Sequence, residues 1–70
     1  MNNKMKAKYY GSWCDFWQGW MNIFRRLSIK ALGNGNMGLY RKHMNAYNTC
    51  SRKFNKNSRK TIWYLDLVME

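Results

Sequence analysis

Basic side chains are the most prominent residues of this sequence that could do chemistry. Thirteen lysines and arginines stand against three acidic residues, which gives a formal net charge of +10 over 70 residues. Arginine can contact phosphate in a bidentate manner, and lysine acts as a point charge. So large an excess opposes folding through self-repulsion, which a polyanionic partner relieves. We therefore expect nucleic-acid contact through Arg25, Arg26, Lys30, Arg41, Lys42, Arg52, Lys53, Lys56, Arg59 and Lys60.

Residues that could catalyse a reaction or hold a metal are few. His43 is the only histidine, and no second acid or base of defined geometry accompanies it. The three carboxylates are scattered along the chain, which argues against a two-metal nuclease site. Cys14, Cys50 and His43 together are one ligand short of a closed zinc site. We therefore expect a protein without catalysis, metal or cofactor, with a metal-independent ribonuclease toxin centred on His43 as an alternative.

Residues 33–38 read Gly-Asn-Gly-Asn-Met-Gly and satisfy the pattern G-x-G-x-x-G. In dinucleotide-binding proteins this pattern follows a strand and precedes an acidic residue by about 20 positions. Here a helical pattern precedes it, and residues 53–60 contain no acid. The segment is therefore predicted to be a turn between helices, since Gly and Asn adopt positive φ readily. A phosphate held at the start of the next helix, beside Arg41 and Lys42, is the alternative.

A first helix over about 13–32 must position Arg25, Arg26 and Lys30. Ser12 and Asp15 have the spacing of a capping box, and Gly33 is a natural stop. Apolar residues recur at three-and-four spacing, which predicts one buried helical face; they are Trp13, Phe16, Trp17, Trp20, Phe24, Leu27 and Ala31. This stripe is expected to form the core or a homo-oligomer interface through Trp13, Phe16, Trp17, Trp20 and Phe24.

A second amphipathic helix is predicted over about 38–54, with Asn36 as its cap. Its apolar face would comprise Leu39, Tyr40, Met44, Tyr47, Cys50 or Ser51, and Phe54. Residues 55–60 form a polar break with three basic residues. The tail 61–69 suits either a short helix capped by Ser58 or a strand paired with Lys6–Tyr10, and helix is slightly favoured.

The expected fold class is mainly α: a small helical hairpin or three-helix domain, with a short terminal strand pair as a variant. Residues 1–11 are interpreted as a basic N-terminal arm and residues 12–70 as a single helical domain. In a hairpin turning near residue 35, Cys50 is about 9 Å out of register with Cys14, so both thiols are expected to be reduced. We expect a cytoplasmic protein of a bacterium or an infected host cell.

Twelve aromatic residues are the second unusual feature of the composition. Bases of single-stranded nucleic acid stack on such rings, and Tyr9, Tyr10 and Tyr40 are the rings least tied to the helical stripe. The expected function is therefore RNA or nucleoprotein binding by a non-catalytic regulator or inhibitor of phage or bacterial type. A related interpretation seats the protein on an enzyme's nucleic-acid groove.

A different function class follows from composition. A small, cationic, Trp-rich helical chain that begins at Met without a signal sequence resembles the leaderless bacteriocins. This resemblance implies a membrane-active peptide that lies on anionic lipid with tryptophan at the interface. A helix that spans a membrane needs about 18 consecutive apolar residues, and no stretch of this sequence approaches that length. The alternative is therefore a peptide bound at the membrane surface.

Overall fold

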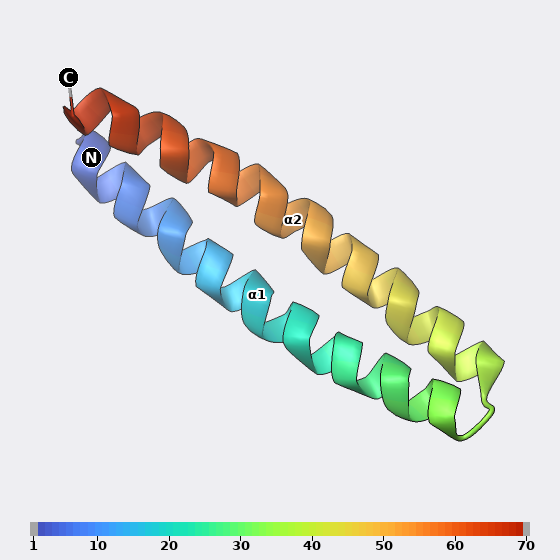
Figure 1. The fold of residues 1–70 in the computed structure, drawn as a ribbon. Helices are drawn as coiled ribbons and strands as arrows, with labels where there is room; N and C mark the ends of the chain where they lie inside the picture. Colours follow the sequence, from blue (N-terminus) through green and yellow to red (C-terminus); the bar gives the residue numbers. More distant parts are fainter. Residues whose placement is uncertain (1, 70) are drawn as a thin grey trace.

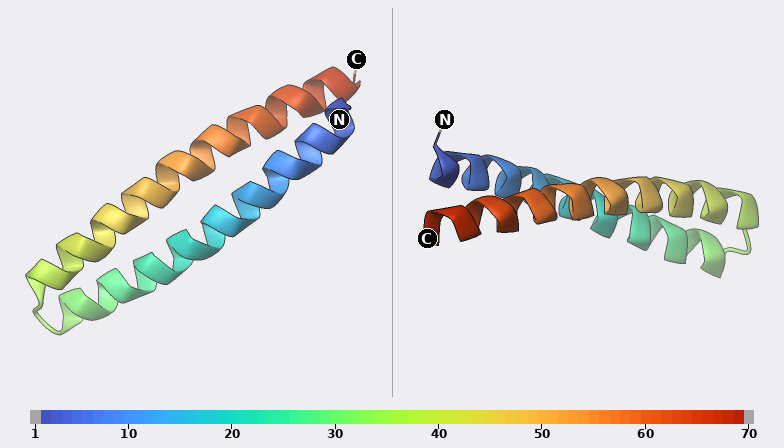
Figure 2. Two further views of the ribbon diagram at one scale, coloured as in Figure 1. Left: turned by 180° about the vertical axis from the view of Figure 1, so that it is seen from behind. Right: turned by 90° about the horizontal axis from the view of Figure 1, so that it is seen from above.

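A computed structural model, which describes residues 2–69, shows that the fold is an antiparallel helical hairpin (Figure 1). Helix α1 spans Asn3–Gly33 and helix α2 spans Met37–Met69. The hairpin measures 52 × 16 × 13 Å, and both chain ends lie at the end opposite the turn (Figure 2). The mainly α prediction is therefore confirmed in its hairpin form, and residues 2–69 contain no strand.

The two helices meet along a seam in which residues alternate at spacings of three and four. This 3.5-residue period is that of a coiled coil, in which one face of each helix stays against its partner. On α1 the seam consists of Ala7, Tyr10, Cys14, Trp17, Met21, Phe24, Ser28 and Ala31, all buried or half-buried. On α2 it consists of Tyr40, His43, Tyr47, Cys50, Phe54, Asn57, Thr61 and Tyr64, again all buried or half-buried.

Small side chains are the most deeply buried residues of the seam. Ala7, Ala31 and Cys50 are between 3% and 5% exposed, and Ser28 is 2% exposed. Ser28 Oγ donates a hydrogen bond of 2.7 Å to the carbonyl of Phe24, which satisfies the hydroxyl inside the seam. The large side chains of the seam, such as Tyr10, Trp17 and Phe24, are half-buried, so the helices cover small side chains completely and large ones only in part.

The aromatic stripe predicted for the first helix is divided between two environments. Trp17 and Phe24 belong to the seam and are half-buried. Trp13, Phe16 and Trp20 are 39%, 47% and 42% exposed, because each lies one position before a seam residue and so about 100° further round the helix. The prediction of a core face is therefore wrong for three of these five rings, and the homo-oligomer alternative stays a prediction.

Helix α1 begins about ten residues before the predicted start. The Asn2 side chain caps it by accepting a hydrogen bond of 2.8 Å from the backbone N–H of Met5. The predicted Ser12 cap is wrong: Ser12 Oγ donates instead to the carbonyl of Lys8. The strand alternative for Lys6–Tyr10 is also wrong, because Ala7 and Tyr10 continue the seam and α1 runs unbroken through the boundary expected at residue 11.

The turn confirms the predicted end of the first helix and the start of the second. Helix α1 ends at Gly33, and Gly35 adopts φ = 73°, a left-handed conformation that favours glycine. Asn36 caps α2 by accepting a hydrogen bond of 3.1 Å from the N–H of Leu39. The G-x-G-x-x-G pattern thus closes a helical hairpin, as predicted.

Helix α2 continues through the segment that was expected to be a polar break. Asn57 Nδ2 donates 2.8 Å to the carbonyl of Lys53, and Thr61 Oγ1 donates 2.9 Å to the carbonyl of Asn57. Both polar side chains occupy seam positions and donate their hydrogen bonds to the backbone of their own helix. The predicted break at 55–60 and the Ser58 cap are therefore wrong, and Lys56, Arg59 and Lys60 are helical residues; the helical preference for 61–69 is confirmed.

The cysteines lie apart in the seam, and both are free. Cys14 Sγ lies 3.9 Å from both the carbonyl oxygen of Phe54 and the hydroxyl of Thr61. Residue 14 therefore faces the part of α2 between 54 and 61, close to the predicted register, and Cys50 lies nearer the turn.

Enlarging a small seam residue should destabilise the hairpin. Ala31→Leu places a bulky side chain where the native residue is 3% exposed, and it should lower the free energy of unfolding by about 1–3 kcal/mol. Gln18→Leu is the control, because Gln18 is exposed and a surface substitution stays within about 0.5 kcal/mol. Urea titration followed by circular dichroism measures both. Equal midpoints for the two variants would contradict the close-packed seam.

Filling the glycine in the middle of α1 should stabilise the protein. A Cβ at Gly19 meets nothing within 4 Å, so Gly19→Ala should raise the free energy of unfolding by about 1 kcal/mol through helix propensity alone. Gly35→Ala is the opposed control, since its positive φ strains any L side chain. Thermal melts should move upward for the first variant and downward for the second. A downward shift for Gly19→Ala would contradict an uninterrupted α1.

Candidate nucleic-acid interface

Five of the predicted phosphate-contacting residues lie on one face of α2. They are Arg52, Lys53, Lys56, Arg59 and Lys60, all exposed. Their spacing over about 12 Å of helix concentrates five positive charges, and like charges three or four residues apart destabilise a helix. No acidic residue lies between Asp15 and Asp66 in the sequence, so nothing on this segment compensates them. An anion from outside this segment is therefore needed to offset the five positive charges of the face.

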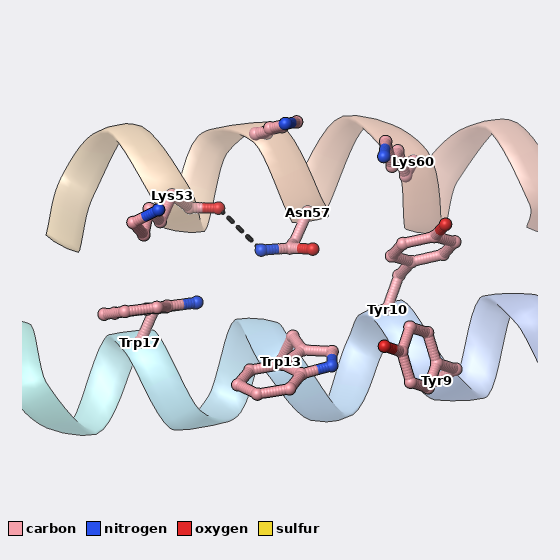
Figure 3. A pocket seen from close by; sticks show the side chains of 8 residues that line it. Tyr9, Tyr10, Trp13, Trp17, Lys53, Asn57 and Lys60 are labelled. Atoms are coloured by element: carbon pink, nitrogen blue, oxygen red, sulfur yellow. Dashed lines mark hydrogen bonds between the residues drawn. The ribbon is translucent and has the colours of Figure 1, made fainter. Parts of the chain in front are cut away.

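The lysines of this face border a groove of about 230 Å³ between the two helices (Figure 3). Aromatic side chains of α1 form one wall, and polar and basic side chains of α2 form the other. We call this the aromatic–lysine groove; its lining is Tyr9, Tyr10, Trp13, Trp17, Lys53, Lys56, Asn57 and Lys60. The hydrogen bond from Asn57 to the Lys53 carbonyl holds the amide between the walls (Figure 3). The groove combines π faces with positive charge in one place.

Two lysines of the groove lie over aromatic rings of the opposite helix. Lys53 Nζ is 5.7 Å from the centre of the Trp17 ring, and Lys60 Nζ is 5.0 Å from the centre of the Tyr10 ring. Cation–π contacts of this kind contribute about 0.5–1 kcal/mol at exposed sites. They direct both ammonium groups across the groove, where a phosphate could replace or share the ring as their partner.

Tyr9 and Trp13 are the rings of the groove that solvent reaches most freely. Tyr9 is 49% and Trp13 is 39% exposed, and their rings pack edge to face at 6.4 Å. Tyr10 is held more firmly, because its ring stacks on that of Tyr64 at 5.6 Å. The first pair therefore offers open surface for a stacking ligand, and the second anchors the wall to α2.

A second hollow continues the basic surface beyond the groove. It is lined by Arg52, Asn55, Lys56, Arg59 and Lys60, so Lys56 and Lys60 border both depressions. All five residues belong to α2. An extended anion leaving the aromatic–lysine groove over Lys56 therefore meets Arg52 and Arg59 next.

The other predicted basic residues lie nearer the turn. Arg25, Arg26 and Lys30 are exposed on the last third of α1, and Arg41 and Lys42 are exposed in the first two turns of α2. None of them lines the aromatic–lysine groove. The structure thus divides the ten predicted residues into a groove-side group of five and a turn-side group of five.

Sequence reasoning found part of the aromatic wall and missed the rest. Tyr9 and Tyr10 were predicted as stacking rings and line the groove, whereas Tyr40 does not. Trp13 and Trp17 were assigned to a single buried stripe. The signal that separates them is the exact 3.5-residue repeat of the seam, which includes Trp17 and excludes Trp13.

His43 takes a structural position. It is half-buried in the seam, with its ring 6.4 Å from that of Phe24. Within residues 2–69, no group of three His, Cys, Asp or Glu side chains could hold a metal ion. The helices of that same range also lack a stretch that is long and apolar enough to cross a membrane.

The candidate interface thus consists of five clustered cations, four aromatic rings and the groove that joins them. Comparison with protein-family models, with curated proteins and with solved structures finds no match.

Proposed function

We propose that this protein binds single-stranded RNA, free or within a protein–RNA complex, through the aromatic–lysine groove. One observation carries the proposal: three exposed lysines of α2 line the same groove as four aromatic rings of α1. Single-strand binding sites combine these two elements, since rings stack the bases and cations follow the backbone. The role is non-catalytic, that of a regulator or inhibitor of phage or bacterial type.

The open rings account for the preference for an unpaired strand. Tyr9 and Trp13 expose enough surface to accept a base, and stacking requires a base that is not already paired within a duplex. Lys53, Lys56 and Lys60 then lie across the groove from the stacked base, within reach of its phosphate. Arg52 and Arg59 follow on the same face for the next phosphates.

The overall charge supports the same proposal. Binding a polyanion releases condensed counterions, and it removes the repulsion among thirteen cations that only three acids offset. A ligand that binds only the folded hairpin also stabilises it by mass action. The cost of concentrating charge on α2 is thereby offset in the bound state.

Removing the groove lysines should weaken RNA binding and flatten its salt dependence. The variant carries Lys53→Gln, Lys56→Gln and Lys60→Gln. For each phosphate contact that it loses, its affinity for a uridine 12-mer should fall about tenfold at 50 mM salt. Its matched control, Lys4→Gln, Lys30→Gln, Lys42→Gln, removes the same charge away from the groove. Fluorescence anisotropy over a salt series measures both affinity and slope. Equal losses in the two variants would show that net charge, not the groove, binds the strand.

Replacing the most exposed ring of the groove should separate stacking from charge. Tyr9→Leu should lose about 1–3 kcal/mol of binding free energy with an unchanged salt slope, whereas Tyr9→Phe keeps the ring and should bind like wild type. Quenching of tryptophan emission by the uridine 12-mer gives an independent readout, because Trp13 and Trp17 line the groove. A Leu variant that binds as tightly as the Phe variant would remove stacking from the proposal.

The wild-type protein also tests the proposal directly. A uridine 12-mer, its deoxy counterpart and a duplex of equal length are compared at 50 mM salt. We expect the single-stranded RNA to bind most tightly. Absence of binding to all three would overturn the proposed function, and preference for the duplex would overturn the groove as the site.

A further inference from the structure

The hairpin leaves most of its large apolar side chains in solvent. Within residues 2–69 the buried apolar residues are Ala7, Ala31 and Cys50, and the buried polar residue is Ser28. A small domain with so little buried surface is marginally stable by itself. The apolar surface that could stabilise this fold lies outside the seam.

Part of that surface forms a regular line along α1, which we call the outer stripe. It consists of Trp13, Phe16, Trp20, Ile23 and Leu27, which are 38% to 47% exposed. Met5 and Tyr9, which are 57% and 49% exposed, continue it towards the N-terminus. The spacing again alternates three and four, so the stripe has the period and the narrow width of a coiled-coil seam. A second helix fits such a line.

Positive charge is absent from the middle of the same helix. From Tyr9 through Phe24 the sequence contains neither lysine nor arginine, and Asp15 is its single charged residue. The positive charge of the chain lies instead on α2 and at the two ends of α1. The middle of α1 is therefore the surface on which another molecule of this protein can approach with the least repulsion.

We propose that two copies of the chain pair through the outer stripe, α1 against α1, around a two-fold axis near Trp20. A two-fold axis makes the helices antiparallel and the interface self-complementary. In this register Trp13 faces Leu27 of the second copy and Phe16 faces Ile23, so a large side chain meets a smaller one. Asp15 then comes beside Arg26 of the second copy, which pairs the isolated carboxylate with a cation.

The outer stripe supplies about half of the area that a specific dimer buries. The exposed parts of its five side chains amount to roughly 420 Å² per chain, at about 200 Å² for a large side chain. Stable interfaces bury about 800 Å² per partner, and flanking atoms of α1 would supply the remainder. Each stripe residue lies one position before a seam residue, about 100° round α1 from α2. The basic residues of α2 therefore stay free in the dimer, whereas Trp13, which also lines the aromatic–lysine groove, lies in the interface.

Substituting the stripe should abolish the dimer. Wild type should sediment in analytical ultracentrifugation with twice the 8.5 kDa of one chain, and Ile23→Asp should sediment as a monomer at the same concentration. Ile62→Asp is the matched control, since Ile62 is 57% exposed on α2, and it should remain dimeric. A monomeric wild type at every concentration, or a monomeric control, would overturn the proposal.

A second variant keeps the test decisive if Ile23→Asp fails to fold. Gly19 is exposed next to the proposed two-fold axis, so Gly19→Cys should form disulfide-linked dimers on mild oxidation. Asn48→Cys, exposed on α2, should not. Covalent dimers from both variants at equal rate, or from neither, would overturn the α1–α1 interface.

Salt separates this proposal from the nucleic-acid function, on which it does not rest. Screening should strengthen association of two chains that each carry +10, whereas it weakens RNA binding. Vesicles of phosphatidylglycerol and phosphatidylcholine test lipid as the occupant. If wild type stays monomeric and partitions into these vesicles with a blue shift of tryptophan emission that Ile23→Asp lacks, the stripe binds lipid and the dimer is overturned.

Discussion

The packing of α1 against α2 along one seam, whose most buried side chains are small, is the constraint on which the rest of this structure depends. Ala7, Ser28, Ala31 and Cys50 occupy its most buried positions, and Asn57 and Thr61 satisfy their polar groups on the backbone of α2. Most of the tryptophan, phenylalanine and isoleucine of α1 lies at other positions round the helix, and these side chains are exposed to solvent.

This exposure creates both surfaces to which we assign a role. Where the exposed rings lie beside α2, they meet Lys53 and Lys60 and form a groove with opposite physical character on its two walls. Where they face away from α2, they form the outer stripe. Trp13 belongs to both surfaces.

The charge distribution separates the cations from the proposed dimer interface. Cations cluster on α2 between Arg52 and Lys60, while the middle of α1 carries Asp15 as its single charged residue. Trp13 lines the groove and also belongs to the outer stripe, so a nucleic-acid strand and a second copy compete for its ring. Nucleic acid that stacks on this ring therefore opposes the dimer.

The sequence by itself determined the helical class, the turn and its caps, and the excess of cations. These features depend on local chemistry: Gly35 at positive φ, the Asn36 side chain on the N–H of Leu39, and charges that no nearby acid offsets. Only the tertiary structure decided where α1 begins, how far α2 continues and which rings are buried. Residues 3–11 and 55–60 are helical because Ala7, Tyr10 and Asn57 continue the seam, and no local signal records that pairing. Likewise Trp13 and Trp17 look alike in a helical pattern, but a rotation of about 40° between their positions places one in solvent and one in the seam.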